Sequence, residues 1–408
     1  MIRLLIIADD FTGALDTGVQ MAGCGAVTKV TTDALCRFED YADAEVLVID
    51  AETRHLKPGA AGELVRSIAE RAKAAGVAHL YKKTDSALRG NIGAELEAML
   101  DASGEKTLPF LPALPQIGRT TVDGVHYIKG VPVAESVFGA DPFEPVTHSA
   151  VSEIIAEQST AAVHNELSLP GICVFDAETQ EDLQRAGEKL KEAGMLHISA
   201  GSAGFGSVLP DLLGLRRETV AAPKLEPRLL VICGSVNPIT LEQTAEADKA
   251  GFAHFRLSPR QKLEPGYWQS EEGRSVLESL RAMLHDSPYF IIDSNDEGGN
   301  GPTEQYAVEH ALTISDVRVG ISRGLGEILG ALFTSPDLGT LLITGGDTLL
   351  QCMRELGVTE LEPVCELYPG VVLSRFAYRG CTKLVLSKSG GFGQKTLLVD
   401  LKNSLSES

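Results

Sequence analysis

Residues 4–16 read LLIIADDFTGALD, and this stretch decides the fold. Its apolar start, Leu4–Ile7, predicts a buried strand, and the amphipathic run over Thr12–Met21 predicts a helix soon after it. Two adjacent carboxylates, Asp9 and Asp10, fall between the two, at the carboxyl end of the strand. A short apolar strand that leads into a longer helix is typical of an α/β protein, in which ligands bind at the carboxyl ends of the strands.

The same alternation continues outward to the end of the chain. In the first half, the other expected strands are Val46–Ile49, His79–Lys82 and Gly171–Phe175. The other expected helices are Pro58–Ala75, Gly93–Leu100 and Glu178–Ala193. In the second half, the expected strands are Leu229–Cys233, Ala253–Leu257, Tyr289–Ile292, Thr340–Thr344, Val371–Ala377 and Thr382–Leu386. The last pair predicts a hairpin and hence a mixed sheet. We therefore expect two α/β domains, each a Rossmann-like sheet flanked by helices.

One segment predicts the boundary between the domains. Residues 216–227, RRETVAAPKLEP, contain two prolines and mixed charges but little periodicity, which is typical of a linker. The expected domains are therefore residues 1–215 and residues 228–408. Two domains joined once predict a cleft between them, the usual place for a small-molecule site.

The charge balance excludes some partners. The chain has 408 residues and a formal net charge of 36 − 56 = −20, so we expect no nucleic acid and no anionic membrane bound over a broad surface. No apolar run approaches the ~18 residues of a membrane span. A small anion in a local basic pocket stays compatible with this charge, and homo-oligomerisation is left open.

Cysteine usage and the N-terminus indicate the compartment. The seven cysteines are scattered and form no CxxC pair, so they predict reduced thiols rather than disulfides or a zinc site. The apolar run at residues 1–7 meets an aspartate pair too soon to be a signal peptide. We therefore expect a cytoplasmic protein.

The aspartate pair after the first strand has two interpretations. Asp10 or Thr12 would cap the following helix by accepting backbone N–H bonds. Capping accounts for one carboxylate but not for two, because adjacent like charges repel unless a cation or a substrate hydroxyl compensates them. The pair therefore also indicates a functional role for Asp9 and Asp10.

A second polar segment, Lys82–Asn91 (KKTDSALRGN), follows another expected strand. Three cations and one carboxylate, together with hydroxyl and amide groups, indicate an anion site, and the alternative is a solvated loop. Arg89 offers a planar fork for a carboxylate or phosphate, and Lys83 supplies point charge.

A third segment, Gly118–Tyr127 (GRTTVDGVHY), contains an Asp-Gly pair flanked by alternating residues and predicts a β-hairpin. Arg119 with two threonines is suited to an anionic, hydroxylated ligand. A purely structural hairpin is the alternative.

Three loops of the second half are rich in glycine and hydroxyl groups, and each follows an expected strand. They are Cys233–Ser235, Thr344–Thr348 and Ser387–Gly393. Glycine lets the backbone approach phosphate closely, and helix N-termini present N–H groups to it. The three loops together predict a nucleotide site, although single glycine turns are common. A P-loop and a GxGxxG fingerprint are absent, and Gly324, Gly326 and Gly330 are expected to serve helix packing. The Asp293–Asp296 segment is interpreted as a polar turn.

These strings resemble the four-carbon acid sugar kinase family. The motifs that carry the resemblance are ADDFTGALD from Ala8, KKTDSALRGN from Lys82, GRTTVDGVHY from Gly118, CGS from Cys233, TGGDT from Thr344 and KSGGFG from Lys388. The resemblance implies a sugar-acid domain followed by an ATP domain. It implies phosphorylation of the terminal C4 hydroxyl of an acid such as D-threonate, D-erythronate or 3-oxo-tetronate, with ATP and Mg²⁺.

The resemblance also implies roles for single residues. The expected ATP contacts are Ser235, Gly345, Gly346, Asp347, Thr348 and Gly390. The expected substrate-binding residues are Lys83, Arg89, Arg119, Thr12 and Ser86. The proton acceptor is expected among Asp10, Asp9 and Asp85, with Asp10 favoured, and Mg²⁺ is expected near Asp347 or the Asp9–Asp10 pair.

Two other functions are weighed against the kinase. An NAD-dependent oxidoreductase of hydroxy acids needs a GxGxxG loop and a ribose-binding acid about 20 residues later, and neither is evident. A non-catalytic sugar-acid sensor is the third hypothesis, and it would bind the acid without ATP.

Overall fold

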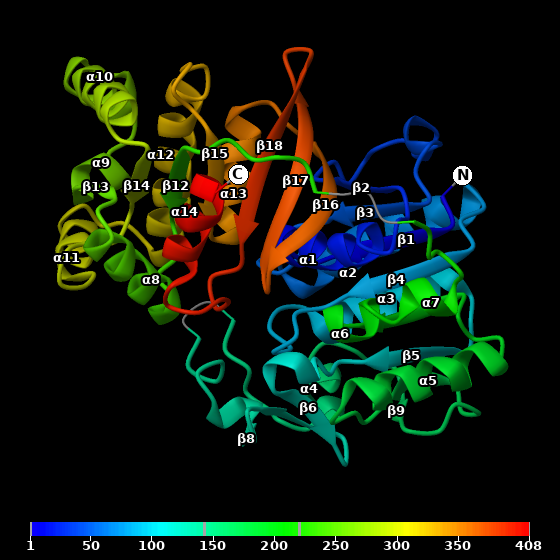
Figure 1. The fold of residues 1–408 in the computed structure, drawn as a ribbon. Coiled ribbons are helices and arrows are strands. Elements are labelled where there is room, and N and C mark those ends of the chain that lie inside the picture. The colour runs from blue at the N-terminus through cyan, green and yellow to red at the C-terminus, as the bar shows by residue number, and fades with distance from the viewer. Residues whose placement is uncertain (1, 142–143, 219–221, 408) are drawn as a thin grey trace. The chain divides into compact units, whose positions relative to one another are not determined.

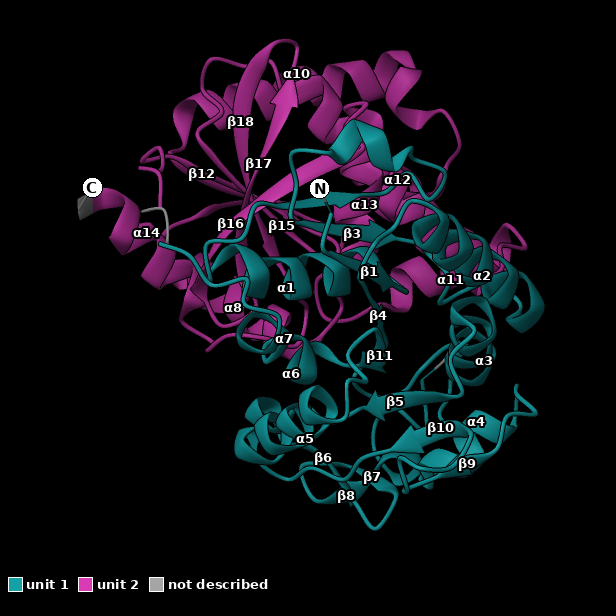
Figure 2. Ribbon diagram, turned by 90° about the vertical axis from the view of Figure 1, so that its right-hand side faces the viewer, with its two compact units in different colours: residues 1–220 teal, residues 221–408 magenta. Residues whose placement is uncertain are grey.

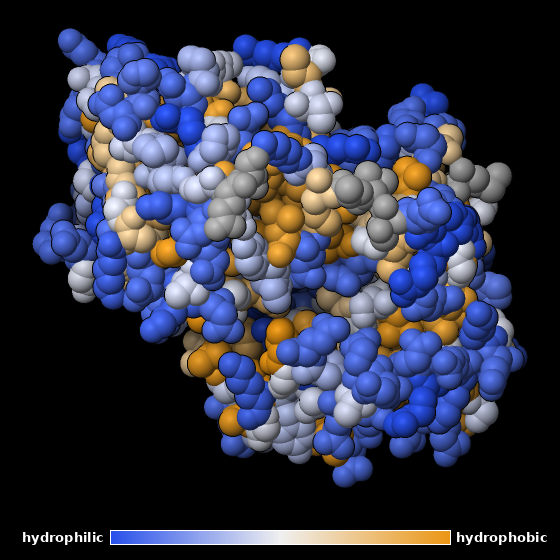
Figure 3. All heavy atoms as spheres, viewed as in Figure 1, coloured by the Kyte–Doolittle hydropathy of each residue, from blue (hydrophilic) through white to orange (hydrophobic). Residues whose placement is uncertain are grey.

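The computed structural model describes residues 2–141, 144–218 and 222–407, and the chain divides into two compact units, residues 1–220 and 221–408 (Figure 1; Figure 2). Residues 219–221 of the expected linker lie outside the described part. None of the described helices combines the length and apolar character that a membrane span requires. Hydrophilic side chains cover most of the face drawn in Figure 3.

Unit 1 is built on a parallel sheet. Its strands in spatial order are β2 (Thr28–Thr31), β3 (Val46–Asp50), β1 (Leu4–Ala8), β4 (His79–Lys83), β11 (Ile198–Gly201), β5 (Thr107–Leu111), β10 (Gly171–Val174) and β9 (Val163–His164). Every residue of β1 and β3 is buried, because helices cover both faces of the sheet.

Two groups of helices make these layers. One group comprises α1 (Phe11–Ala22), α5 (Gln180–Glu192), α6 (Ala203–Gly206) and α7 (Leu209–Leu212), and the other comprises α2 (Pro58–Ala74), α3 (Ile92–Ser103) and α4 (Val151–Ala156). The members of each group pack on one another, and Figure 2 shows the two groups on opposite faces of the sheet. The core on the α2–α3 side joins Leu5 and Ile7 of β1 to Ile68 and Leu96.

The expected hairpin at residues 118–127 is confirmed. A small antiparallel sheet contains β6 (Arg119–Val122), β7 (Val125–Ile128) and β8 (Val131–Pro132). The turn places Asp123 at φ 49° and Gly124 at φ 73°, the left-handed pair that a tight hairpin turn requires.

Unit 2 contains a mixed sheet, as expected. Its strands in spatial order are β13 (Ala253–Arg256), β14 (Tyr289–Asp293), β12 (Leu229–Cys233), β15 (Thr340–Thr344), β18 (Cys381–Lys388), β17 (Val371–Tyr378) and β16 (Glu360–Tyr368). The first five are parallel, and the β17–β18 hairpin and β16 are antiparallel.

Helices cover both faces of this sheet as well. Helices α8 (Pro238–Lys249) and α14 (Leu397–Glu407) pack together, and so do α9 (Pro259–Leu263), α10 (Glu271–Asp286), α12 (Ile314–Leu332) and α13 (Gly346–Glu355). A further helix, α11 (Gly301–Glu309), contacts α9. Gly324, Gly326 and Gly330 lie inside α12, as expected, and a Cβ on Gly326 would lie 3.0 Å from the backbone of Gln351. Helix α13 begins at Gly346, directly after its N-cap Gly345.

Candidate active site

Parallel pairing brings three polar segments of unit 1 to one edge of the sheet. Strand β1 lies between β3 and β4, and Ala8 is in register with both Asp50 and Lys83. The aspartates after β1, the segment after β3 and the Lys83–Arg89 segment after β4 therefore leave the sheet side by side.

Arg54, four residues after β3, joins these segments. Its Nε donates to Asp9 Oδ2 over 2.7 Å, and its Nη2 lies 2.8 Å from Asp10 Oδ1 and 3.7 Å from Asp85 Oδ1. One largely buried guanidinium thus compensates three carboxylates, and it is the cation that the adjacent aspartates need. The sequence analysis missed Arg54, although it follows a strand end just as the predicted residues do.

Asp10 also caps helix α1. Its side chain accepts a 3.0 Å hydrogen bond from the Gly13 amide, while Thr12 already lies in the first turn, so the capping role expected for Asp10 or Thr12 belongs to Asp10. Because about a quarter of the Asp10 side chain is exposed, it is the accessible member of the aspartate pair. Asp9 is buried, and its Oδ1 has no hydrogen-bond partner among the described residues.

The three candidate proton acceptors differ in their surroundings. Burial alone would raise the pKa of Asp85, but the guanidinium of Arg89, which donates over 2.8 and 3.0 Å, holds that pKa well below its usual range. For Asp9 burial likewise raises the pKa, but the charges of Arg54, Lys82 and Lys83 together outweigh it and lower the pKa. Asp85 also accepts from the amides of Ala87 and Arg89, so it is the most committed of the three carboxylates.

Arg119 has a different environment. Its Nη1 donates to Ser86 Oγ, and it forms no ion pair within the described part of the chain. The guanidinium carbons of Arg89 and Arg119 lie 5.1 and 5.0 Å from the centre of the Phe138 ring. Burial, together with the charges of Arg89 and Arg54, lowers the pKa of Arg119, although the charge of the nearby Asp85 acts in the opposite direction. A guanidinium that lacks a carboxylate partner is suited to bind an anion.

His126 contacts Ser86, the residue that accepts a hydrogen bond from Arg119. Its Nε2 lies 2.9 Å from the Ser86 carbonyl oxygen, and its Nδ1 lies 3.0 Å from Thr121 Oγ1. Burial lowers the pKa of His126 to about 4, so the ring is neutral at pH 7. The neutral ring donates from Nε2 to Ser86 and accepts from the Thr121 hydroxyl.

The two lysines of the second polar segment, Lys82 and Lys83, have different partners in the structure. Lys82, counted among the cations of the expected anion site, instead forms a fully buried 3.0 Å ion pair with Glu95 on α3. Successive strand residues point to opposite faces, so Lys82 pairs with Glu95 while Lys83 does not, although the charges of both lysines act on Asp9. The Nζ of Lys83 donates to the Thr84 carbonyl and would lie 2.7 Å from a Cβ on Gly13, beside the Asp10 carboxylate.

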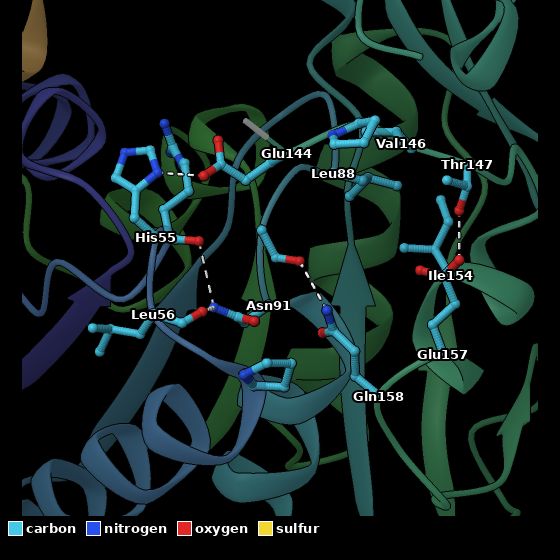
Figure 4. Close-up of a pocket in the computed structure, with 14 residues that line it drawn as sticks. His55, Leu56, Leu88, Asn91, Glu144, Val146, Thr147, Ile154, Glu157 and Gln158 are labelled. Carbon is cyan, nitrogen blue, oxygen red and sulfur yellow. Dashed lines mark hydrogen bonds and ion pairs between the residues drawn. The ribbon is translucent and has the colours of Figure 1, made fainter. Parts of the chain in front are cut away.

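A pocket of about 300 Å³ lies next to this cluster and shares Arg54 with it (Figure 4). Asn91 Nδ2 donates to the carbonyls of Thr53 and Leu56, and Gln158 Nε2 donates to Gly90. These bonds fix the loop that carries Arg54 against the loop that carries Arg89.

In unit 2, three strand ends meet in the same way. Cys233, Thr344 and Lys388 are in register across β12, β15 and β18. A Cβ on Gly234 would lie 1.8 Å from Thr348 Oγ1, and a Cβ on Gly390 would lie 2.6 Å from Ser235 Oγ. The loops therefore approach one another closely because they carry glycine.

The start of α13 completes this glycine cradle, which we define as Gly234, Ser235, Gly345–Thr348 and Gly390. Gly345 has φ 103°, and the first helical bond runs from the Leu349 amide to its carbonyl. The amides of residues 346–348 consequently point out of the helix start, where the helix dipole favours an anion.

The surroundings of the cradle test the expected Mg²⁺ positions. Asp347 is part-exposed and lies 3.2 Å from Arg318, so it can contribute one carboxylate oxygen. The charge of Arg54 already compensates the Asp9–Asp10 pair, so these two carboxylates need no further cation. No group of three or more acidic, histidine or cysteine side chains in the described ranges is placed to hold a metal. A single carboxylate such as Asp347 fits a Mg²⁺ ion whose other ligands are mainly phosphate oxygens and water.

The polar turn expected at Asp293–Asp296 supports the cradle. Asn295 Nδ2 donates to the Ser235 carbonyl over 3.1 Å and to Asp293 Oδ1 over 2.7 Å. Asp296 pairs with the buried Lys262 and accepts from the Thr303 amide. Through the Asn295 bond this turn fixes the backbone of Ser235.

Comparison with known proteins assigns the two halves of the chain to two kinds of domain. Residues 4–209 match the model of a sugar-binding N-terminal domain, and residues 230–398 match that of a nucleotide-binding C-terminal domain. The chain is 29% identical to a D-threonate kinase of Salmonella typhimurium, over 98% of this chain and 97% of that protein. It is 26% identical to a D-erythronate kinase of Heliobacterium modesticaldum (90% and 89%) and 27% identical to a 3-oxo-tetronate kinase of Escherichia coli (88% and 96%).

Solved structures share the fold. A Salmonella typhimurium protein described as a tRNA synthase superposes with a TM-score of 0.80 at 20% identity, over 99% of this chain and 100% of that one. A Haemophilus influenzae protein superposes with a TM-score of 0.70 at 21% identity, over 98% and 99%. With both domain models matched in order along its length, the chain is an enzyme that belongs to the four-carbon acid sugar kinase family.

Proposed function

We propose that this enzyme transfers the γ-phosphoryl group of ATP to the terminal C4 hydroxyl of a four-carbon acid sugar, such as D-threonate, D-erythronate or 3-oxo-tetronate. The relatives named for these three substrates support the acid class. The match to a nucleotide-binding domain supports ATP.

One observation carries the proposal: Arg119 is a part-buried guanidinium that has no carboxylate partner among the described residues and lies beside Arg89 on the ring of Phe138. A sugar-acid carboxylate would supply the missing negative charge through two parallel hydrogen bonds. Ser86 and Thr12 would then contact the hydroxyl groups, and Lys83 would neutralise charge near Asp10.

The chemical step assigns one role to Asp10. The C4 hydroxyl oxygen attacks the γ-phosphorus, the bond to the β–γ bridging oxygen breaks, ADP leaves, and the hydroxyl proton passes to the Asp10 carboxylate. Asp10 is favoured over Asp9, which is buried, and over Asp85, which Arg89 holds. Positioning and charge neutralisation supply most of the catalysis in such transfers.

The glycine cradle would hold the nucleotide phosphates. The contacts proposed are Ser235, the backbone of Gly345, Gly346, Asp347 and Thr348, and Gly390. When Mg²⁺ is bound, it neutralises phosphate charge, and Asp347 is the carboxylate that would hold it. Transfer requires the acid and the nucleotide to meet during turnover, and the expected interdomain cleft stays a prediction.

A coupled ADP-release assay across the three acids tests the function. We expect ADP only in the presence of a four-carbon acid, and we expect Arg119→Ala to raise KM for the acid by about 10- to 100-fold, the loss of one charge-assisted pair. KM for ATP should not change. Arg185→Ala, which removes an exposed guanidinium of unit 1, is the matched control. A wild-type enzyme that releases no acid-dependent ADP would sink the proposal.

A further inference from the structure

Lys388, the last residue of β18, is a buried cation beneath the glycine cradle. Its side chain is 2% exposed, and no carboxylate lies within ion-pair distance of it in the described part of the chain. Nζ instead donates to Thr240 Oγ1 over 3.2 Å and to the carbonyls of Ser389 and Gly390, each over 3.1 Å. A buried ammonium that is met only by neutral oxygens is costly unless an anion compensates it.

These bonds decide where the backbone of the next loop points. In a trans peptide the C=O and the following N–H point in opposite directions. Because Lys388 draws the carbonyls of Ser389 and Gly390 inward, the amides of Gly390 and Gly391 are turned outward, and the described structure contains no cis peptide. Neither amide donates a backbone hydrogen bond within the described residues, and Gly391 is exposed.

Thr240 ties the same loop to the rest of the cradle. Its hydroxyl lies 2.9 Å from the Gly390 carbonyl and 3.2 Å from Ser235 Oγ, so Lys388, Gly390 and Ser235 share one partner. Two outward amides beside the open start of α13 form a concave set of donors of the kind that binds phosphate.

We infer that Lys388 is a positioning residue of nucleotide binding: through the Ser389 and Gly390 carbonyls it aims the amides of Gly390 and Gly391 at the phosphates, and its charge adds to their attraction. This inference rests on the proposed ATP site and extends it to a residue whose side chain need not touch the nucleotide.

Calorimetric titration of the full-length enzyme with ADP and with ATP tests the inference. We expect Lys388→Met to weaken both affinities by about 10- to 100-fold, because a charge and two oriented donors are lost. Lys388→Arg keeps the charge and should restore part of the affinity. Lys383→Met removes an exposed lysine from the same strand and should bind as the wild type does.

A second variant and a kinetic measurement separate positioning from folding. Thr240→Val keeps the charge but removes the shared hydroxyl, so it should weaken ADP binding while circular dichroism stays native. Lys388→Met should raise KM for ATP and leave KM for the acid unchanged. A folded Lys388→Met or Thr240→Val enzyme that binds ADP as tightly as the wild type overturns the inference alone. A wild type that binds neither nucleotide overturns the proposed function as well.

Discussion

At the scale of single residues, unit 1 depends on Arg54 for its charge balance. Its guanidinium is the shared partner of Asp9, Asp10 and Asp85, three carboxylates from two different strand ends. Arg89 adds a bidentate pair with Asp85, while Arg119 is left for a ligand. Arg54 and Arg89 therefore have carboxylate partners, whereas Arg119 has none among the described residues.

We expect Arg54→Met to destabilise the enzyme by about 3–5 kcal/mol, the cost of stranding buried carboxylates. The free energy of unfolding in urea measures this loss. The control is Arg216→Met, which breaks an exposed pair with Asp211 and should leave the free energy of unfolding nearly unchanged. Equal small losses in the two variants would contradict the role given to Arg54.

The buried Lys388 ammonium leads us to expect that stability and ATP affinity depend on pH in opposite directions. Burial lowers its pKa to about 8, below the ordinary value of the unfolded chain, so its contribution to stability improves as pH rises from about 8 towards 10.5. ATP affinity should fall as pH rises through about 8, because the ammonium loses its charge there. The Cys233 thiol faces it from β12, and burial holds the pKa of that thiol well above its usual value.

The readout for this prediction is the difference between wild type and Lys388→Met in calorimetric and urea titrations at pH 7 to 10. The variant should lose the excess pH dependence in both. A wild-type ATP affinity that stays flat across this range, relative to the variant, would contradict the prediction.

At the scale of elements, the glycine cradle is set by the distance between β12 and the start of α13. A Cβ on Gly234 would lie 1.8 Å from Thr348 Oγ1, which no ordinary packing tolerates. Helix α13 begins at Gly346, so any displacement of Thr348 moves its first amides. The same contact that brings the loops together therefore fixes the direction of the anion-binding donors.

Gly234→Ala should consequently weaken ADP affinity by about 10-fold or more, through displacement of the α13 start. Gly301→Ala is the control, because a Cβ at that helix start meets nothing within 4 Å. Titration calorimetry on both variants measures the effect. If Gly234→Ala binds ADP normally, the cradle is not the nucleotide site.

Local pattern predicted most elements but missed several. Continuous apolar runs identified β1, β3, β12 and β15, because strands buried on both faces leave a clear signal. Strand β5 contains Pro109 and β9 spans two residues, so neither has such a run. Strand β16 includes Glu362 and Glu366, and its place in the sheet depends on pairing with β17 rather than on its own pattern.

For the site, strand-end reasoning predicted that Asp10, Arg89 and the glycine loops lie at the carboxyl ends of the strands, and the structure places them there, because parallel strands gather these ends at one edge. It could not separate Lys82 from Lys83, since only three-dimensional packing shows that Glu95 pairs with Lys82. Arg54 was missed for a related reason, because its carboxylate partners are distant in the sequence. Lys388 was missed because its bonds to the neighbouring carbonyls of Ser389 and Gly390 form only in the folded loop.

At the scale of the whole molecule, both proposed substrates are anions, whereas the chain carries a net charge of −20. At 0.01 M salt the Debye length is about 30 Å, so the whole surface repels an approaching acid, while at 0.15 M it is about 8 Å. We therefore expect kcat/KM for the acid to rise as KCl increases from 0.01 to 0.15 M. Initial rates at fixed MgATP measure it, and a steady fall with salt would show that the local arginines dominate the approach.

The glycine cradle has one more consequence, for how the enzyme survives stress. Its three loops come from residues 234, 345 and 390, so the donors converge only after unit 2 has completely folded. A nucleotide present at about 100 times its dissociation constant would stabilise that folded state by about 2.7 kcal/mol and give nothing to partly folded chains. Nucleotide in the cell would therefore reduce the misfolding and proteolysis of this enzyme.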